Sequence, residues 1–138
     1  MSNSINSDLI ATANAIVSAV STQSITAELQ YSPDFLLPQL SAEKIVVVPY
    51  GIEKKLLARS GAKEVTHIIE IAILKRGKNL DIPTLIEEAE SIGEKLLGKT
   101  FSGKICLGIE FDPVYDADML RSSNQFTSVI VARLRGLA

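Results

Sequence analysis

The chain has 138 residues, of which 14 are basic and 16 acidic, giving a formal net charge of −2. Hydrophobic residues make up 46% of the sequence, and 41 residues are Ile, Leu or Val, a composition that excludes intrinsic disorder. The near balance of charge argues against a protein that mainly neutralises nucleic-acid phosphates. One cysteine, Cys106, and one histidine, His67, are too few for an internal disulfide or a Cys/His metal cluster.

This length predicts a single domain over residues 1–138. The polar N-terminus has neither the basic start nor the apolar core of a signal peptide. The densest apolar run, residues 68–74, is far shorter than the roughly 20 residues of a membrane helix. We therefore expect a soluble protein that is synthesised in a cytoplasm.

Two amphipathic helices are predicted. Apolar residues recur at helical spacing over residues 6–21, where Ser7 or Asp8 can cap the first free amides. A second helix is predicted to begin after Asp81 as N-cap, or with Thr84 and Glu87 as an alternative capping box. It is predicted to end at Gly98, which suits the left-handed position after a helix. Its expected core stripe comprises Leu85, Ile86, Ala89, Ile92, Leu96 and Leu97.

Strands are predicted where apolar residues alternate with polar ones or where β-branched residues run together. The predicted ranges are 25–31, 45–48 (ended by Pro49), 65–74, 105–111 and 126–134. Helices and strands in this order predict an α+β fold, with a mostly antiparallel or mixed sheet of four to five strands and two helices packed on one face.

The strand over residues 65–74 is apolar on both faces. One face carries Val65, Ile69, Ile71 and Ile73, and the other carries Ile68, Ala72 and Leu74. A strand of this kind is covered on both faces, and the two helices can cover only one of them. The second face therefore requires a long loop or another subunit, and the sequence leaves open which face points inward.

Residues 93–100 match the phosphate-loop pattern G-x-x-x-x-G-K-T letter for letter. That motif binds phosphate when a strand precedes the loop and a helix begins at its Lys-Thr end. Here the order is reversed, because Gly93 lies inside the predicted second helix and Lys99 leads into a strand. We interpret Gly98 as a helix C-terminal residue, and nucleotide binding remains the less favoured alternative.

The remaining candidates for chemistry have simpler structural interpretations. His67 shares a predicted strand face with Val65 and is expected to be a buried or edge residue with a hydrogen bond, and Cys106 is expected in the core. Four carboxylates surround the segment between the last two strands, namely Glu110, Asp112, Asp116 and Asp118. They lack the regular spacing of a calcium loop, so we expect solvated charges. No catalytic, cofactor-binding or metal-binding residue is predicted.

The 14-residue segment Asp112–Gln125 is predicted to be a long polar loop. Loops of this length in a compact domain are usually functional or mobile. We expect this loop to be mobile in the free subunit and to be ordered by a neighbouring subunit or a partner.

Several segments, taken in chain order, resemble one family. They are the N-terminal helix, a strand ending in Val47-Val48-Pro49, the strand Ile69–Arg76, the helix capped by Asp81, and the closing segment Phe126–Arg135. Together they look like the small tail-terminator or tail-completion (neck) proteins of long-tailed bacteriophages. The resemblance implies an α+β subunit that assembles into a ring, typically a hexamer, capping the tail tube and meeting the head connector. It implies no catalytic residues.

We therefore expect a structural virion protein of a bacteriophage or prophage, located in the tail or neck and made in the bacterial host cytoplasm. It is predicted not to be an enzyme, and to lack a cofactor, a membrane partner and sequence-specific binding to nucleic acid. The alternatives are another neck or tail-completion component and a small nucleotide-binding α+β domain. The residues predicted to contact other subunits or phage partners are Ile68, Ala72, Leu74, Tyr115, Asp116, Arg121, Arg133 and Arg135.

Overall fold

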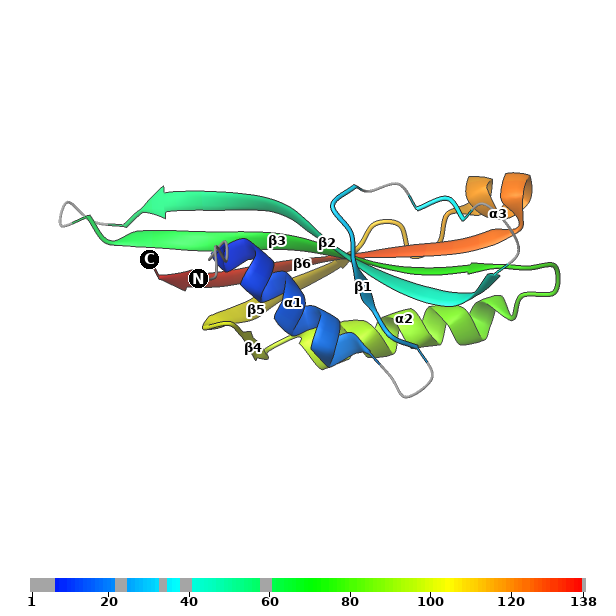
Figure 1. Ribbon diagram of the computed structural model, residues 1–138, viewed down its shortest axis with the longest axis horizontal. Coiled ribbons are helices and arrows are strands. Elements are labelled where there is room, and N and C mark those ends of the chain that lie inside the picture. The colour runs from blue at the N-terminus through cyan, green and yellow to red at the C-terminus, as the bar shows by residue number, and fades with distance from the viewer. Residues whose placement is uncertain (1–6, 22–24, 33–34, 38–40, 58–60, 138) are drawn as a thin grey trace, which may run out of the picture.

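The computed structural model describes residues 7–21, 25–32, 35–37, 41–57 and 61–137. Its elements, in chain order, are α1 (Asp8–Val20), β1 (Glu28–Leu29), β2 (Ser41–Leu56), β3 (Lys63–Arg76), α2 (Ile82–Leu96), β4 (Thr100–Phe101), β5 (Lys104–Phe111), α3 (Ala117–Ser123) and β6 (Gln125–Leu137). The strands form one sheet in the order β1-β2-β3-β6-β5-β4. Strand β1 is parallel to β2 and the other pairs are antiparallel, so the sheet is mixed and mostly antiparallel. Figure 1 shows that β2, β3 and β6 run along the long axis of an elongated molecule.

The prediction of an α+β fold with a mixed sheet is confirmed, but the element counts differ. The described residues form six strands rather than four to five, and three helices rather than two. The one strand outside the five predicted ranges is β4, which has two residues, and α3 lies in the segment that was expected to be a loop. Only Glu28–Leu29 of the predicted strand 25–31 pairs with a neighbour. No helix in the described part of the chain is long and apolar enough to span a membrane.

The two predicted helices cover one face of the sheet. Ser7 caps α1 by accepting a hydrogen bond from the Ile10 N–H, and Asp81 caps α2 through the Thr84 N–H, each at 3.3 Å. Buried side chains of both helices join one core cluster with Ile69, Ile71 and Ile73 of β3. The helix-covered face of the predicted strand 65–74 is therefore the one that carries Ile69, Ile71 and Ile73. Other members of this cluster are Ala13, Ile16, Val20, Leu85, Ala89, Ile92, Leu96, Ile130, Ala132 and Leu134.

A second, smaller core covers half of the opposite face. Leu37 packs with Ala72 and Leu74 of β3, with Val129 of β6, and with two β2 side chains, while Phe35 lies against this cluster. The Gln125 side chain holds the covering segment, because its Oε1 accepts from the Leu37 N–H at 2.8 Å and its Nε2 donates to the Phe35 carbonyl at 2.7 Å. This cover is therefore supplied by the chain itself, as a loop rather than a second subunit.

Strand β2 continues through Pro49, which was predicted to end it. Its pairing with β3 shifts register between Pro49 and Gly51 and then continues to Leu56. Proline lacks an N–H, and it is tolerated here because β1 covers the outer edge of β2 only at Val46 and Val47. The result is a long β2–β3 hairpin whose distal half extends past the first turn of α1 (Figure 1).

A second irregularity divides β5. Its register against β6 shifts between Cys106 and Gly108, and Leu107 lies in the shift. Before the shift Cys106 points into the core, as expected; after it Ile109 and Phe111 pack against the same core. Leu107 is left half exposed, so the predicted alternation of 105–111 does not hold along the whole strand.

Lys104 links β5 to the start of α1. Its Nζ lies 2.7 Å from Asp8 Oδ2, and its side chain is almost completely buried while that of Asp8 is exposed. This ion pair lowers the pKa of Asp8. Nearby, His67 is buried with its Nδ1 3.0 Å from Thr12 Oγ1, which confirms the expected hydrogen-bonded core histidine. Burial, followed by the charge of Lys104, lowers the pKa of His67.

Candidate functional site

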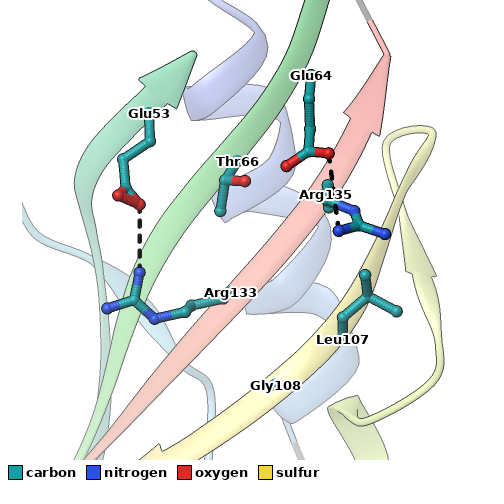
Figure 2. Close-up of a pocket in the computed structure, with 7 residues that line it drawn as sticks. All are labelled: Glu53, Glu64, Thr66, Leu107, Gly108, Arg133 and Arg135. Carbon is teal, nitrogen blue, oxygen red and sulfur yellow. Dashed lines mark hydrogen bonds and ion pairs between the residues drawn. The ribbon is translucent and has the colours of Figure 1, made fainter. Parts of the chain in front are cut away.

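The other half of the sheet face opposite α1 is open and carries charged side chains. Strand register places Gly51, Ile68, Arg133 and Gly108 in one row across four strands. The next row contains Glu53, Thr66, Arg135 and Ile105. We call the surface formed by Glu53, Glu64, Thr66, Leu107, Arg133 and Arg135 the open face. Figure 2 shows its side chains in front of the strands, with α1 behind the sheet.

Two ion pairs run diagonally across the open face. Arg133 Nη1 lies 3.3 Å from Glu53 Oε1, and Arg135 Nη1 lies 3.7 Å from Glu64 Oε2 (Figure 2). Both arginine side chains remain about half exposed. A guanidinium group has five N–H donors, so each arginine retains donors that can reach carboxylates of a partner. The open face is therefore suited to binding a charged protein surface.

The cleft in the open face is small for a metabolite. Its volume is about 280 Å³, below the roughly 300–1,000 Å³ of typical small-molecule pockets. Its lining contains two carboxylates and two guanidinium groups already paired with each other, and Thr66 and Leu107 supply neither a base nor an activated nucleophile.

The predicted interface residues fall into three groups. Arg133 and Arg135 lie on the open face, and Ile68, the β3 partner of Arg133, points to the same side of the sheet. Ala72 and Leu74 are buried under Leu37 at 0% and 2% exposure, so they provide no surface for another subunit. The third group, Tyr115, Asp116 and Arg121, lies around α3 and beside the second, because the Asp116 N–H donates to the carbonyl of Thr127, the β6 partner of Leu74.

The α3 residues have local structural roles. Asp116 caps α3 by accepting from the Met119 N–H at 3.0 Å, and Arg121 pairs with Asp118 one turn away. Tyr115 is partly exposed just before the helix.

Among the described residues, no group of three or more His, Cys, Asp or Glu side chains could hold a metal ion. Burial, together with the charge of Asp112, raises the pKa of Glu70.

The sequence did not indicate the acidic half of the open face. Glu53 and Glu64 lie on either side of the β2–β3 turn, and each reaches an arginine of β6 that is 71 or more positions away along the chain. Their identification requires the strand register, which pairs Glu53 of β2 with Thr66 of β3 and Thr66 with Arg135 of β6. A period-2 pattern by itself does not give this pairing.

A pair of glutamates, Glu43 and Glu88, was also missed. Burial raises the pKa of Glu43 to about 7, and the Glu88 carboxyl beside it contributes in the same direction. The pair lies in a cleft between β2 and α2 that Lys75 also lines.

The phosphate-loop match lies where the sequence predicted, at the C-terminal end of a helix. Gly93 is within α2, and Gly98 follows it with φ of +80°. The Lys99 N–H donates to the Leu96 carbonyl at 3.1 Å, and the chain then enters β4. Because a helix ends here and none begins, this segment does not present a helix N-terminus to a phosphate.

Comparisons with known proteins support the fold. No protein-family model and no curated protein sequence matches the chain. A chain from the virion of a native gene transfer agent particle has a similar structure, with a TM-score of 0.56 at 14% identity over 94% of this chain and 92% of that one. A chain from the sheath/tube terminator of the PVC extracellular contractile injection system, in its extended state, aligns over 99% of this chain and 58% of that one. At 10% identity and a TM-score of 0.35, this second alignment is too weak to show a shared fold. The predicted resemblance to proteins of phage-like particles is confirmed for the fold.

Proposed function

We propose that this chain is a non-enzymatic structural protein of a phage-like virion, a tail terminator that folds as a single domain over residues 1–138. Its subunits form a ring that ends growth of the tail tube and joins the tail to the head connector. The observation that carries the proposal is the fold, which matches a chain of a gene transfer agent virion over nearly the full length of both.

The surface chemistry supports an assembly role. The open face presents half-exposed arginines in a cleft smaller than a typical metabolite pocket. Exposed guanidinium groups are suited to the carboxylates of a protein partner, and we assign the open face to the tail tube or the head connector. The virion is then the location of the protein, after synthesis in the bacterial host.

Removal of the gene from the strain that encodes it tests the role. A missing terminator should give tail tubes longer than those of the wild type, because nothing stops their growth. Electron microscopy of released particles measures the tube lengths, and a plasmid copy of the gene should restore them. Tubes of normal length that fail to join heads would assign the chain to the alternative role, another neck or tail-completion component.

A further inference from the structure

The sheet has two free edges, one along β2 and one along β5. Strand β1 pairs with β2 only at Val46 and Val47, so in the described chain the outer edge of the distal half of β2 has no neighbouring strand. Strand β4 and Lys99 cover β5 only as far as Cys106. Unpaired strand edges carry free N–H and C=O groups that can add a strand from another chain.

We propose that these two edges pair between copies of this chain, the β2 edge of one copy adding to the β5 edge of the next. The proposal deepens the proposed function, because it rests on ring assembly and names the surfaces that would form the ring.

Apolar side chains accompany both edges. On β2 and just after it, Tyr50, Ile52, Leu56 and Leu57 are all about half exposed or more. Beside β5, a cleft against α2 is lined by Leu97, Ile109 and Phe111. Gly93 allows α2 to approach this closely, because a Cβ at that position would lie 3.0 Å from Phe111 Cζ. We call the distal half of β2, with Tyr50, Ile52, Leu56 and Leu57, the arm. Its exposed apolar side chains can be buried against the apolar cleft of another copy.

The charges of the two edges are complementary. On the helix-covered side of the sheet the β2 edge carries Lys54, whereas Lys55, opposite Glu64, points to the open face. The β5 cleft, on the helix-covered side, is rimmed by Glu90 and Glu94 of α2. All four side chains are exposed, and none takes part in an ion pair between described residues. Glu90 and Glu94 are one helical turn apart and repel each other, which a cation from another copy would relieve. This complementarity favours a second copy of the chain as the occupant of the cleft.

Strand directions agree with this pairing. The chain of antiparallel pairs β2–β3, β3–β6 and β6–β5 makes β2 antiparallel to β5. The free half of β2 lies level with the part of β5 that β4 covers, so the next copy must be displaced along the strands. A rotation about a ring axis to which the strands are tilted supplies this displacement and keeps β2 of one copy antiparallel to β5 of the next. Each copy uses one edge for each neighbour, and a contact of this kind closes into a ring when the rotation allows it.

Charge reversal tests the proposed contact. An arm variant, Lys54→Glu, and a cleft variant, Glu90→Lys with Glu94→Lys, change only exposed residues, so both should fold with an unchanged circular dichroism spectrum. Wild-type protein should sediment as a defined multi-subunit species, and each variant should self-associate at least about tenfold more weakly. A matched control, Lys78→Glu, reverses an exposed charge in the β3–α2 turn and should assemble like the wild type.

Mixing the two variants gives the decisive result. In a 1:1 mixture every arm can meet a cleft of opposite charge, so assembly should return although neither variant assembles alone. A monomeric wild type at high concentration, or a mixture that stays dissociated, would overturn the inference. Wild-type assemblies that both variants also form would overturn it too, while leaving the proposed function in place. Assembly through these edges combined with normal tail length in the gene deletion would instead overturn the proposed function alone.

Discussion

At the scale of single residues, Glu43, which lies beside Glu88, makes the stability of the fold depend on pH. Because burial raises the pKa of Glu43 to about 7, the folded protein holds a proton that the unfolded chain has already released at pH 6. Stability from this group is therefore fully present below the ordinary pKa of glutamate, and it is lost as the pH rises toward about 7.

Glu43→Gln should remove this loss of folding stability with rising pH. We expect the variant to be more stable than the wild type by about 1–2 kcal/mol at pH 8, with a much smaller difference near pH 4.5. Urea denaturation at both pH values measures the effect. Glu90→Gln, which removes an exposed carboxylate from α2, the helix that carries Glu88, is the control and should show no such gain at pH 8. A Glu43→Gln variant with the same stability profile as the wild type would refute the assignment.

Lys99 tests the phosphate-loop pattern at the same scale. It is exposed after the end of α2, so Lys99→Ala should change the free energy of unfolding by less than about 0.5 kcal/mol and leave assembly intact. Isothermal calorimetry should detect no ATP binding to either protein. Micromolar ATP binding that the substitution abolishes would favour the nucleotide-binding alternative.

At the scale of elements, β3 is buried on both faces over its C-terminal half. Ile71 faces the helices, and Leu74 faces the cover supplied by Leu37; each is at most 2% exposed. The sequence offered a loop or a second subunit as the cover of the second face, and the structure supplies the loop. Ala72 and Leu74 are therefore covered within the subunit, and the sheet edges are the surfaces proposed for contacts between copies.

Both Ile71→Glu and Leu74→Glu should destabilise the isolated subunit by about 3–5 kcal/mol, because each buries an unpaired carboxylate. Ile68→Glu is the matched control on the same strand. Ile68 pairs with Arg133 on the side of the sheet that carries the open face, and it is only partly buried. The variant should therefore remain folded. Thermal unfolding followed by circular dichroism compares the three. A stable, folded Leu74→Glu protein would mean that the cover over β3 is not retained in solution.

The segment Asp112–Gln125 is a second case in which an element differs from its expectation. Seven of its residues form α3, capped by Asp116 and ended by Asn124 in the left-handed conformation with φ of 51°. None of the α3 side chains is buried, so the helix leaves no apolar stripe in the sequence. The cap at Asp116 alone was too weak a signal to predict α3 from the sequence. That a neighbouring subunit or a partner orders this segment stays a prediction.

At the scale of the whole molecule, the open face and the sheet edges have different roles. We assign the edges to contacts between copies and the open face to the tail tube or head connector. The open face combines charges from both arms of the β2–β3 hairpin and from β6, so it exists only once the sheet has formed.

Arg133→Ala combined with Arg135→Ala should separate assembly from stability. Half-exposed ion pairs contribute about 0–1 kcal/mol each, so the subunit should fold and self-associate like the wild type. In complementation of the gene deletion, however, the double variant should fail to restore normal tails. Arg121→Ala removes an exposed ion pair near α3 and serves as the comparison. Full restoration by the double variant would show that the open face contacts no essential partner.

The sequence alone determined the features that depend on neighbours in the chain. The two helices, the helix end at Gly98 and the β-branched runs are local, so propensity and periodicity were enough to predict them. The burial of His67 and Cys106 followed from the same reasoning. The sequence left Ser7 or Asp8 as the first cap, and the structure shows that it is Ser7.

The tertiary structure decided what depends on pairing between distant segments. It decided that Ile71 faces the helices, because one strand that is apolar on both faces is compatible with either orientation. It placed Glu53 against Arg133, since register joins residues 80 positions apart. It left Leu107 exposed, because a one-residue register shift in β5 reverses which side chains face the core, and no alternation in the sequence marks that shift.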